Sequence, residues 1–167
     1  MTTYLLDANT LIEAKNRYYS MTICPAYWSW VQRSNDAGFV ASIEPVGVEL
    51  MRGNDQLADW ARDHGDLFLA VSDEPTQLAF ASVAAHVAAG SGSMRPGALE
   101  EFLAGADPWL IAKAMTSADA VVVTHEQFNP QMRRKYSIPN VCQQFGVPWI
   151  DTFELLRRTE ARFVLDE

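Results

Sequence analysis

Four carboxylates stand at positions where a protein of alternating strands and helices could bring them together. Two of them follow apolar, strand-like runs: one comes directly after TYLL (residues 3–6), and one lies three residues beyond AVVV (residues 120–123). The other two lie on predicted helices. Ligands of open α/β sheets bind beyond the carboxyl ends of the strands, so acids at those ends could share one site. The four residues are Asp7, Glu49, Asp107 and Glu126.

Converging carboxylates need a counter-charge. Two unit charges ~4 Å apart repel by on the order of 4 kcal/mol at an effective dielectric constant near 20. Divalent cations offset this repulsion, and a set of oxygen ligands favours Mg²⁺ or Mn²⁺. Such ions can generate hydroxide and stabilise the oxygens of an in-line phosphoryl displacement. If the four acids meet, they therefore predict a metal site suited to phosphodiester hydrolysis.

Each acid also has a structural explanation when it is taken alone. Asp7 could equally be a polar residue at a strand-to-helix turn, and Asp107 before Pro108 is a favourable helix cap, which by itself we favour over catalysis. Glu49 borders the apolar face of its helix, where a lone carboxylate is costly to desolvate, so a partner or a cation is expected there. Glu126 is less well explained as a residue that starts a helix, because the following segment QFNPQM is a poor helix opening.

The elements that would position these acids alternate along the chain. Strands are predicted at 3–6, 39–42, 120–123 and 147–150, and such alternation favours an α/β fold with a parallel sheet covered on both faces. We expect one domain over residues 1–167. Residues 66–75 are ambiguous, and GSGSMRPG (90–97) is predicted to be a loop. Helices are expected over residues 42–51, 75–89, 107–118 and 139–146. Further helices are expected to start at Asn9 or Thr10 and run toward Tyr19, to start at Pro25 and at Asn54, and to follow Asp151, which caps the last one.

Composition narrows the class of protein. The chain has 167 residues and a formal net charge of −8, which argues against a general nucleic-acid coat, because phosphate neutralisation usually needs a basic protein. It remains compatible with an enzyme that grips nucleic acid through cations and one local basic patch. Cys24 and Cys142 are isolated, the apolar runs are too short to span a bilayer, and we see no secretion signal, so a reduced, cytoplasmic protein without membrane contact is expected.

The sequence resembles the PIN-domain nucleases, the family that includes the VapC toxins of bacterial toxin–antitoxin pairs. The resemblance covers most of the chain and implies a three-layer α/β/α fold with a central parallel sheet. Its metal-binding acids would correspond to Asp7, Glu49, Asp107 and Glu126, with Thr124 orienting the site and Asn9 as the small polar residue after the first aspartate. The motifs that carry it are YLLDANTLI (4–12), VGVELMRG (46–53), ADPWLIAKA (106–114) and VVVTHE (121–126).

The resemblance implies a metal-dependent endoribonuclease that uses one or two Mg²⁺ or Mn²⁺ ions and acts as the toxin of such a pair. An antitoxin partner that offers Arg or Lys to the acids, and a homodimer, would follow. The fourth motif departs from the family pattern, because glutamate stands at position 126 where aspartate is commoner, and its longer side chain changes the geometry of the fourth ligand. The segments ICPAYWSWV (23–31) and 138–158 resemble a less-studied PIN subgroup.

Other functions stay open. The protein could be an RNA-processing PIN nuclease without a toxin role, or a non-catalytic PIN-fold binding module, although the presence of all four acids speaks against the latter. Mg²⁺-dependent phosphatases of the haloacid-dehalogenase type need a second aspartate two residues after the first, where this chain has Asn9.

Three further features could touch RNA. The run Arg133-Arg134-Lys135 is by default a solvated face, with phosphate contact as the second interpretation. We expect His125 to be a hydrogen-bonding surface residue. Core packing is favoured over base stacking for the aromatic group, with exposure of one or two rings left open. That group comprises Tyr18, Tyr19, Tyr27, Trp28 and Trp30.

Overall fold

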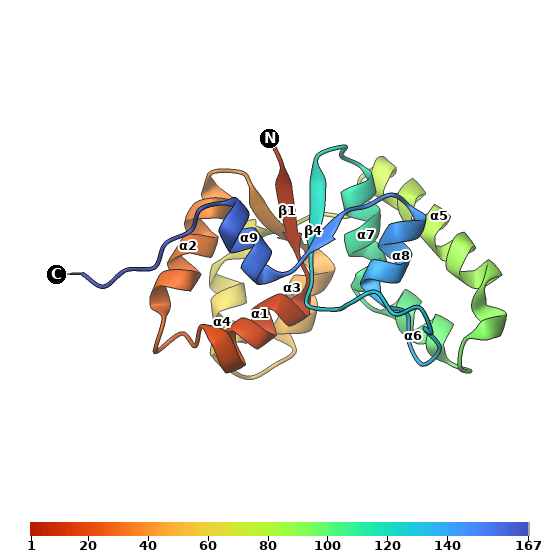
Figure 1. The fold of residues 1–167 in the computed structure, drawn as a ribbon, viewed down its shortest axis with the longest axis horizontal. Coiled ribbons are helices and arrows are strands. Elements are labelled where there is room, and N and C mark those ends of the chain that lie inside the picture. Colours follow the sequence, from red (N-terminus) through yellow and green to blue (C-terminus); the bar gives the residue numbers. More distant parts are fainter. Residues whose placement is uncertain (167) are drawn as a thin grey trace.

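The computed structural model describes residues 1–166 of the chain, and a parallel sheet of five strands lies at its centre (Figure 1). The strand order is β3-β2-β1-β4-β5, and every neighbouring pair runs parallel. The predicted α/β fold with a parallel sheet is therefore confirmed. The strands are β1 (Thr3–Leu6), β2 (Val40–Ile43), β3 (Phe68–Leu69), β4 (Ala120–Val123) and β5 (Trp149–Ile150).

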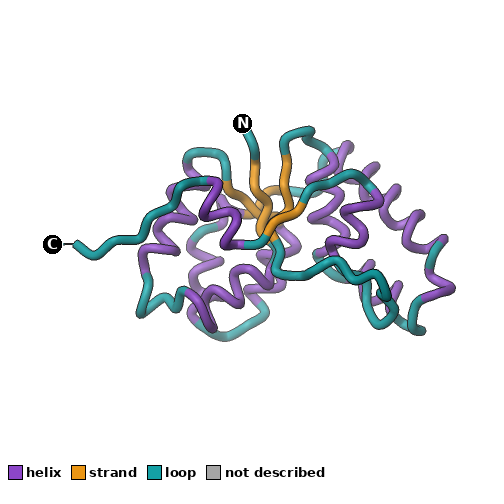
Figure 2. Tube along the Cα trace, in the orientation of Figure 1, coloured by secondary structure: helices purple, strands orange, loops and turns teal. Residues whose placement is uncertain are grey.

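Helices cover both sides of the sheet. In Figures 1 and 2, α2, α4 and α9 lie to one side of the strands, and α5, α7 and α8 lie to the other. The α-helices are α1 (Ala8–Glu13), α2 (Pro25–Asp36), α3 (Glu44–Met51), α4 (Gln56–Asp63), α5 (Glu74–Ala89), α6 (Ala98–Ala104), α7 (Asp107–Met115), α8 (Ile138–Gln144) and α9 (Thr152–Arg158). Helix α1 continues as a π-helical turn η1 (Ala14–Tyr18), and 3₁₀ turns occur at η2 (Gly65–Leu67) and η3 (Ser91–Ser93).

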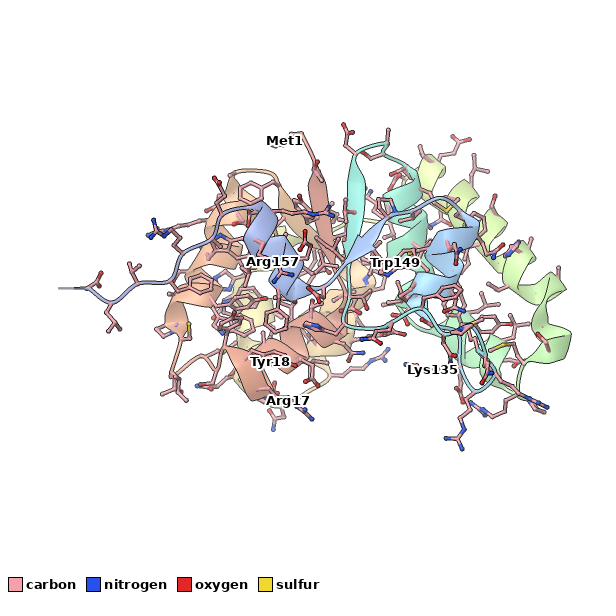
Figure 3. The ribbon with its side chains drawn as sticks, viewed as in Figure 1. Met1, Arg17, Tyr18, Lys135, Trp149 and Arg157 are labelled. Atoms are coloured by element: carbon pink, nitrogen blue, oxygen red, sulfur yellow. The ribbon has the colours of Figure 1, made fainter. Side chains whose placement is uncertain are left out.

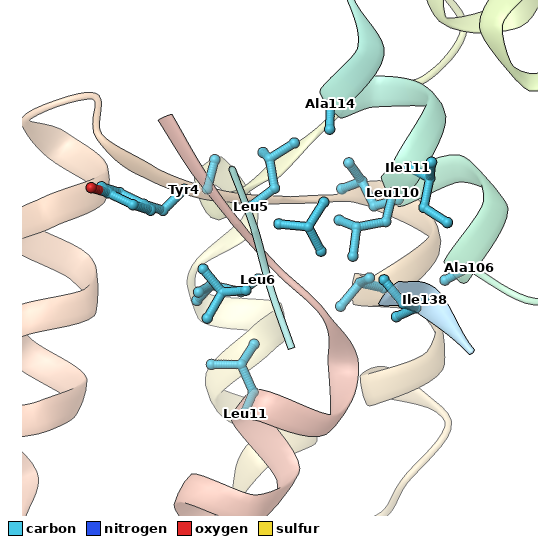
Figure 4. Close-up of a cluster of buried hydrophobic side chains, with 14 of the residues drawn as sticks. Tyr4, Leu5, Leu6, Leu11, Ala106, Leu110, Ile111, Ala114 and Ile138 are labelled. Carbon is cyan, nitrogen blue, oxygen red and sulfur yellow. The ribbon is translucent and has the colours of Figure 1, made fainter. Parts of the chain in front are cut away.

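The two central strands, β1 and β4, are mostly apolar because both of their faces lie in the core. Leu6 of β1 and Val123 of β4 are 1% and 0% exposed, because helices pack on both faces of the sheet. Figure 4 shows Leu5 of β1 on the side of Leu110 and Ile111 of α7, and Leu6 on the opposite side of the strand, near Leu11 of α1. Burying each such side chain contributes about 1.5–3 kcal/mol relative to leaving it in water. This packing fixes where the two central strands end.

The register of the two central strands sets the site. Leu6 of β1 pairs with Val123 of β4, so the residues that follow them, Asp7 and Thr124, leave the sheet side by side. The backbone N–H of Asp7 continues the ladder by donating to the carbonyl of Val123 at 3.1 Å. Two polar residues 117 positions apart in sequence are thereby held at the same edge.

Several predicted boundaries need correction. The strand predicted over 147–150 is reduced to Trp149–Ile150, and the helix predicted to reach residue 118 ends at Met115. The ambiguous stretch 66–75 contains the two-residue strand β3. The loop predicted over 90–97 includes η3 and is followed by α6, which the sequence did not indicate. No helix within residues 1–166 combines the length and apolar character needed to cross a bilayer.

Candidate metal centre

Asp7 combines a structural role with a position at the site. It is the N-cap of α1, where its Oδ1 accepts from the backbone N–H of Thr10 at 2.8 Å. The prediction that Asn9 or Thr10 caps this helix is therefore wrong. The second oxygen, Oδ2, accepts from the hydroxyl of Thr124 at 2.7 Å, and the residue is 2% exposed. Asp7 is a buried, oriented carboxylate whose two oxygens have only neutral donors.

Asp107 is not the helix cap that its position before Pro108 suggested. Ala106 occupies the N-cap of α7, Asp107 is the first helical residue, and no side chain makes the capping hydrogen bond. The carboxylate of Asp107 is therefore not used in starting its own helix. This observation removes the strongest structural explanation for that acid.

Glu49 ties α3 to the start of α7. Its Oε1 accepts from the backbone N–H of Ala106 at 3.0 Å, immediately before Asp107. The partner expected for this half-buried carboxylate is thus a backbone amide. The contact positions Glu49 beside the acid on the neighbouring helix.

Three of the four acids line one cavity of about 200 Å³. Asp7, Glu49 and Asp107 contribute to its wall, together with the exposed side chain of Asn9. Glu101 on α6 also lines it, and the sequence analysis did not single out this acid. Glu101 was missed because α6 itself was not predicted. Its Oε2 accepts from Arg95 Nη2 at 2.8 Å, so this carboxylate already has a cationic partner.

The fourth acid, Glu126, does not line this cavity and lines a different pocket. Its side chain is 15% exposed, its Oε1 accepts from the backbone N–H of Ile138 at 3.4 Å, and Lys135 Nζ lies 3.8 Å from the same oxygen. Its negative charge nevertheless acts on two other acids, because it raises the pKa of Asp7 and of Asp107.

The electrostatics show that the four carboxylates act on one another. The pKa of Asp107 is raised to about 7, mainly by burial and in addition by the charges of Glu126, Asp7 and Glu49. Burial also raises the pKa of Asp7 to about 6, although the hydrogen bond from Thr124 opposes this shift. Both carboxyl groups thus hold protons unusually tightly, chiefly because burial disfavours their charged forms and also because neighbouring carboxylates repel a negative charge there.

The chemical type of the four side chains suits a hard divalent cation. Asp7, Glu49, Asp107 and Glu126 supply only oxygen ligands, which Mg²⁺ and Mn²⁺ prefer. Within residues 1–166, no three His, Cys, Asp or Glu side chains are placed as a ready cluster that could hold an ion. Oxygens of three of the four acids accept from protein groups instead: those of Asp7 from Thr10 and Thr124, that of Glu49 from Ala106, and that of Glu126 from Ile138. The unbalanced charge around Asp107 is the feature that a cation would neutralise.

Thr124 holds this arrangement together. Its hydroxyl donates to Asp7 Oδ2 and accepts from the backbone N–H of Glu126 at 3.1 Å, and the residue is 1% exposed. Thr124→Val should destabilise the protein by about 1–3 kcal/mol, because it leaves a buried carboxylate oxygen without a donor. Urea unfolding measures this loss, and Thr124→Ser, which keeps the hydroxyl, is the matched control. Equal stability of the valine and serine variants would contradict the role assigned to the hydroxyl.

The basic run lies beside the acids, and its backbone is held in place. Lys135 approaches Glu126, whereas the side chains of Arg133 and Arg134 are exposed. Arg95 donates from its backbone N–H to the carbonyl of Arg133 at 2.8 Å and from Nε to that of Arg134 at 3.0 Å. Contact of the three basic side chains with RNA stays a prediction.

The aromatic group divides as the sequence analysis allowed. Tyr27 and Trp28 are core residues at 1% and 5% exposed, whereas the ring of Tyr18 is 46% exposed. The hydrogen bond expected for His125 is absent at Nε2, which is buried without a partner within residues 1–166, although the residue as a whole is partly exposed. No signal in the sequence marks either Tyr18 or His125 as exceptional.

Comparison with known proteins places the chain in a family. The family model described as "Domain of unknown function (DUF4411)" matches residues 4–163. The chain belongs to the DUF4411 family. No curated protein matches this DUF4411 chain.

The fold of this DUF4411 protein is similar to that of a solved structure, VapBC2 from Rickettsia felis bound to a DNA fragment from their promoter. The match has a TM-score of 0.52 at 11% sequence identity and covers 90% of this chain and 98% of the other. At that identity the likeness concerns the fold alone. It confirms the PIN-like α/β architecture that the sequence motifs implied.

Proposed function

We propose that this protein is a metal-dependent endoribonuclease that hydrolyses RNA phosphodiester bonds. The observation that carries the proposal is that Asp7, Glu49 and Asp107 line one cavity, with Glu126 close enough to raise the pKa of two of them. The likeness of fold to VapBC2 supports the same class of protein.

The four acids would hold one or two Mg²⁺ or Mn²⁺ ions, which when bound supply a water of lowered pKa and positive charge for the phosphoryl oxygens. The protein's own contribution is placement. Thr124 and the N-terminus of α1 fix the carboxylate of Asp7, and the backbone N–H of Ala106 fixes that of Glu49. Lys135, with an exposed side chain at the edge of the site, offers a positive charge to an approaching phosphate.

The physiological role we propose is that of a toxin with an antitoxin partner. An antitoxin would inhibit the enzyme by presenting Arg or Lys to the same carboxylates, where charge-assisted hydrogen bonds are strong. A homodimer is proposed on the family resemblance. Induced expression should arrest growth, and a small protein encoded beside this gene should relieve the arrest. Absence of both effects would leave an RNA-processing nuclease as the better assignment.

RNA cleavage by the purified protein tests the catalytic proposal. With Mg²⁺ or Mn²⁺, fluorescently labelled single-stranded RNA should be cut internally, and excess chelator should stop the reaction. A DNA oligonucleotide of the same sequence is the control for substrate class. Intact RNA at micromolar enzyme in both metals, or cleavage that persists in chelator, would contradict the proposal.

A further inference from the structure

A second pocket lies directly beside the acids, beyond the carboxyl ends of β4 and β5. Its volume is about 540 Å³, within the range of about 300–1,000 Å³ typical of small-ligand sites. Thr124 and Glu126 line it, and these residues also belong to the candidate metal centre. A group bound in this pocket would therefore be adjacent to a phosphate held at the acids.

The pocket has aromatic walls that are open to solvent. The ring of Tyr18 meets that of Phe153 edge to face, with centroids 5.1 Å apart, and lies 5.8 Å from the imidazole of His125. Tyr18 is 46% exposed, and Trp149 of β5 also borders the pocket (Figure 3). Exposed aromatic faces of this kind are the surfaces on which unpaired bases stack.

The placement of Tyr18 follows from an unusual piece of backbone. Helix α1, capped by Asp7, continues as the π-helical turn η1, which ends at Tyr18. Single π-helical turns occur frequently at functional sites. One continuous segment thus begins at an acid of the metal centre and ends at the aromatic wall of the pocket.

Polar groups in the pocket lack partners. The Nε2 atom of His125 is buried and makes no hydrogen bond within residues 1–166, which costs about 1–3 kcal/mol. Asp151 uses Oδ1 to cap α9 by accepting from the N–H of Glu154 at 2.8 Å, and no hydrogen bond to its Oδ2 is present in the described residues. Gln127 adds an exposed side-chain amide, which can both donate and accept.

The charges of the lining select the kind of ligand. Glu126 and Asp151 contribute carboxylates, and in the described chain no Lys or Arg lines this pocket. A phosphate group would be repelled, whereas carboxylates accept hydrogen bonds from the amino groups of bases. The ligand that fits is therefore a planar, uncharged ring that carries an N–H₂ donor.

We propose that this pocket binds one unpaired nucleobase with an exocyclic amino group. Tyr18 stacks on the base, Phe153 meets the base edge to face, and Gln127 and Asp151 contact the edge of the base. The link to catalysis rests on the proposed ribonuclease function: the base belongs to a nucleotide next to the cleaved bond, so the pocket contributes to the choice of cleavage position.

Adenosine, which has no phosphate, tests the pocket independently of nuclease activity. In chelator, adenosine titrated into ¹⁵N-labelled full-length protein should shift the amide signals of Tyr18, His125 and Gln127, and uridine should bind more weakly. Tyr18→Ala should weaken adenosine binding at least about tenfold, because stacking on one aromatic ring supplies that much affinity. Tyr18→Phe keeps the ring and should restore binding.

Leu78→Ala is the matched surface control, since Leu78 is 62% exposed on α5 and does not line this pocket. It should bind adenosine like the wild type. Shifts confined to another region, or a Tyr18→Ala variant that binds adenosine unchanged, would overturn the inference. Adenosine binding with uncut RNA would reject the nuclease proposal and leave the nucleobase site standing.

Cleavage of RNA with a single abasic nucleotide, moved one position at a time, tests the link to catalysis. Removal of one base should slow cleavage at the neighbouring bond at least about tenfold, and Tyr18→Ala should show no further loss on that substrate. Equal rates at every abasic position, with normal cleavage of intact RNA, would contradict a base pocket that guides cleavage.

Discussion

Asp7→Asn and Asp107→Asn are each expected to lower RNA cleavage at least about a thousandfold, because metal-based charge stabilisation is worth several kcal/mol. Both substitutions keep the size of the side chain and remove its negative charge. The fold should persist. Asn at position 7 retains an oxygen that can accept from Thr10, and Asp107 makes no side-chain capping bond whose loss would weaken α7.

Asp36→Asn is the matched control for these variants, since Asp36 is an exposed aspartate at the end of α2. It should cleave RNA at the wild-type rate. Circular dichroism and thermal unfolding check that all three variants are folded. Wild-type rates in both Asp7→Asn and Asp107→Asn would reject the assignment of these acids to the site.

The metal-free protein is expected to lose stability as the pH rises from 5 to 8. The pKa values of Asp7 and Asp107 in the folded protein are about 6 and about 7, above the ordinary value of 3.8. The folded state therefore binds protons more tightly than the unfolded state. The stabilisation that comes from protonated Asp7 and Asp107 is fully present below pH 4 and is lost as the pH rises through 6 and 7.

Asp7 is 2% exposed, and its pKa rises from 3.8 to about 6 on folding. This rise corresponds to a loss of on the order of 3 kcal/mol in the free energy of unfolding between low and high pH. Urea unfolding in chelator at pH 5, 6, 7 and 8 measures the slope. Asp7→Asn and Asp107→Asn should each flatten it and should unfold less readily than the wild type at pH 8. A wild-type slope that both variants retain would show that other groups cause it.

Divalent cations should reverse this loss. At pH 8 a bound cation stabilises the folded protein by RT ln(1 + [L]/Kd), which is about 2.7 kcal/mol at a hundredfold excess over Kd. Mn²⁺ should therefore raise the unfolding midpoint of the wild type at pH 8 and should do so much less in Asp107→Asn. The same increase in both proteins would place the ion elsewhere.

The sequence predicted the central strands because they are buried on both faces. A strand without polar residues, such as the run that ends at Val123, is typical of a sheet covered by helices on both faces. The burial of this strand could therefore be predicted from its sequence. The strands β3 and β5 have two residues each, and pairing with a neighbour rather than local sequence defines them. Their bounds could not be read from hydrophobic pattern.

The four acids of the candidate site could be predicted from the sequence, whereas Glu101 could not. Asp7 and Glu126 follow clear strand ends, and Glu49 borders an apolar helix face. Taken alone, Asp107 was better explained as a helix cap, and the resemblance to PIN domains implied its role as a metal ligand. Helix α6 was missed because its N-cap is Gly97, at φ +89°, which follows the turn signal Pro96 and offers no capping side chain. Glu101 was lost with it.

Residues of the second pocket depend on backbone geometry that sequence does not encode locally. Tyr18 belongs to an aromatic group in which Tyr27 and Trp28 are core residues of α2, whereas Tyr18 itself lies at the end of the π-helical turn η1 and is exposed. His125 lies next to a predicted ligand, yet its burial without a partner depends on packing against Tyr18 and Phe153.

The most direct test of the four-acid site is calorimetric titration of Mn²⁺ into the purified, chelator-treated protein at pH 7.5. The account predicts saturable binding of one or two ions that weakens at least about tenfold in Asp107→Asn, because removing one charged ligand costs more than about 1.4 kcal/mol. Asp36→Asn should bind Mn²⁺ like the wild type. Absence of binding to the wild type, or equal affinity in Asp107→Asn, would contradict the account.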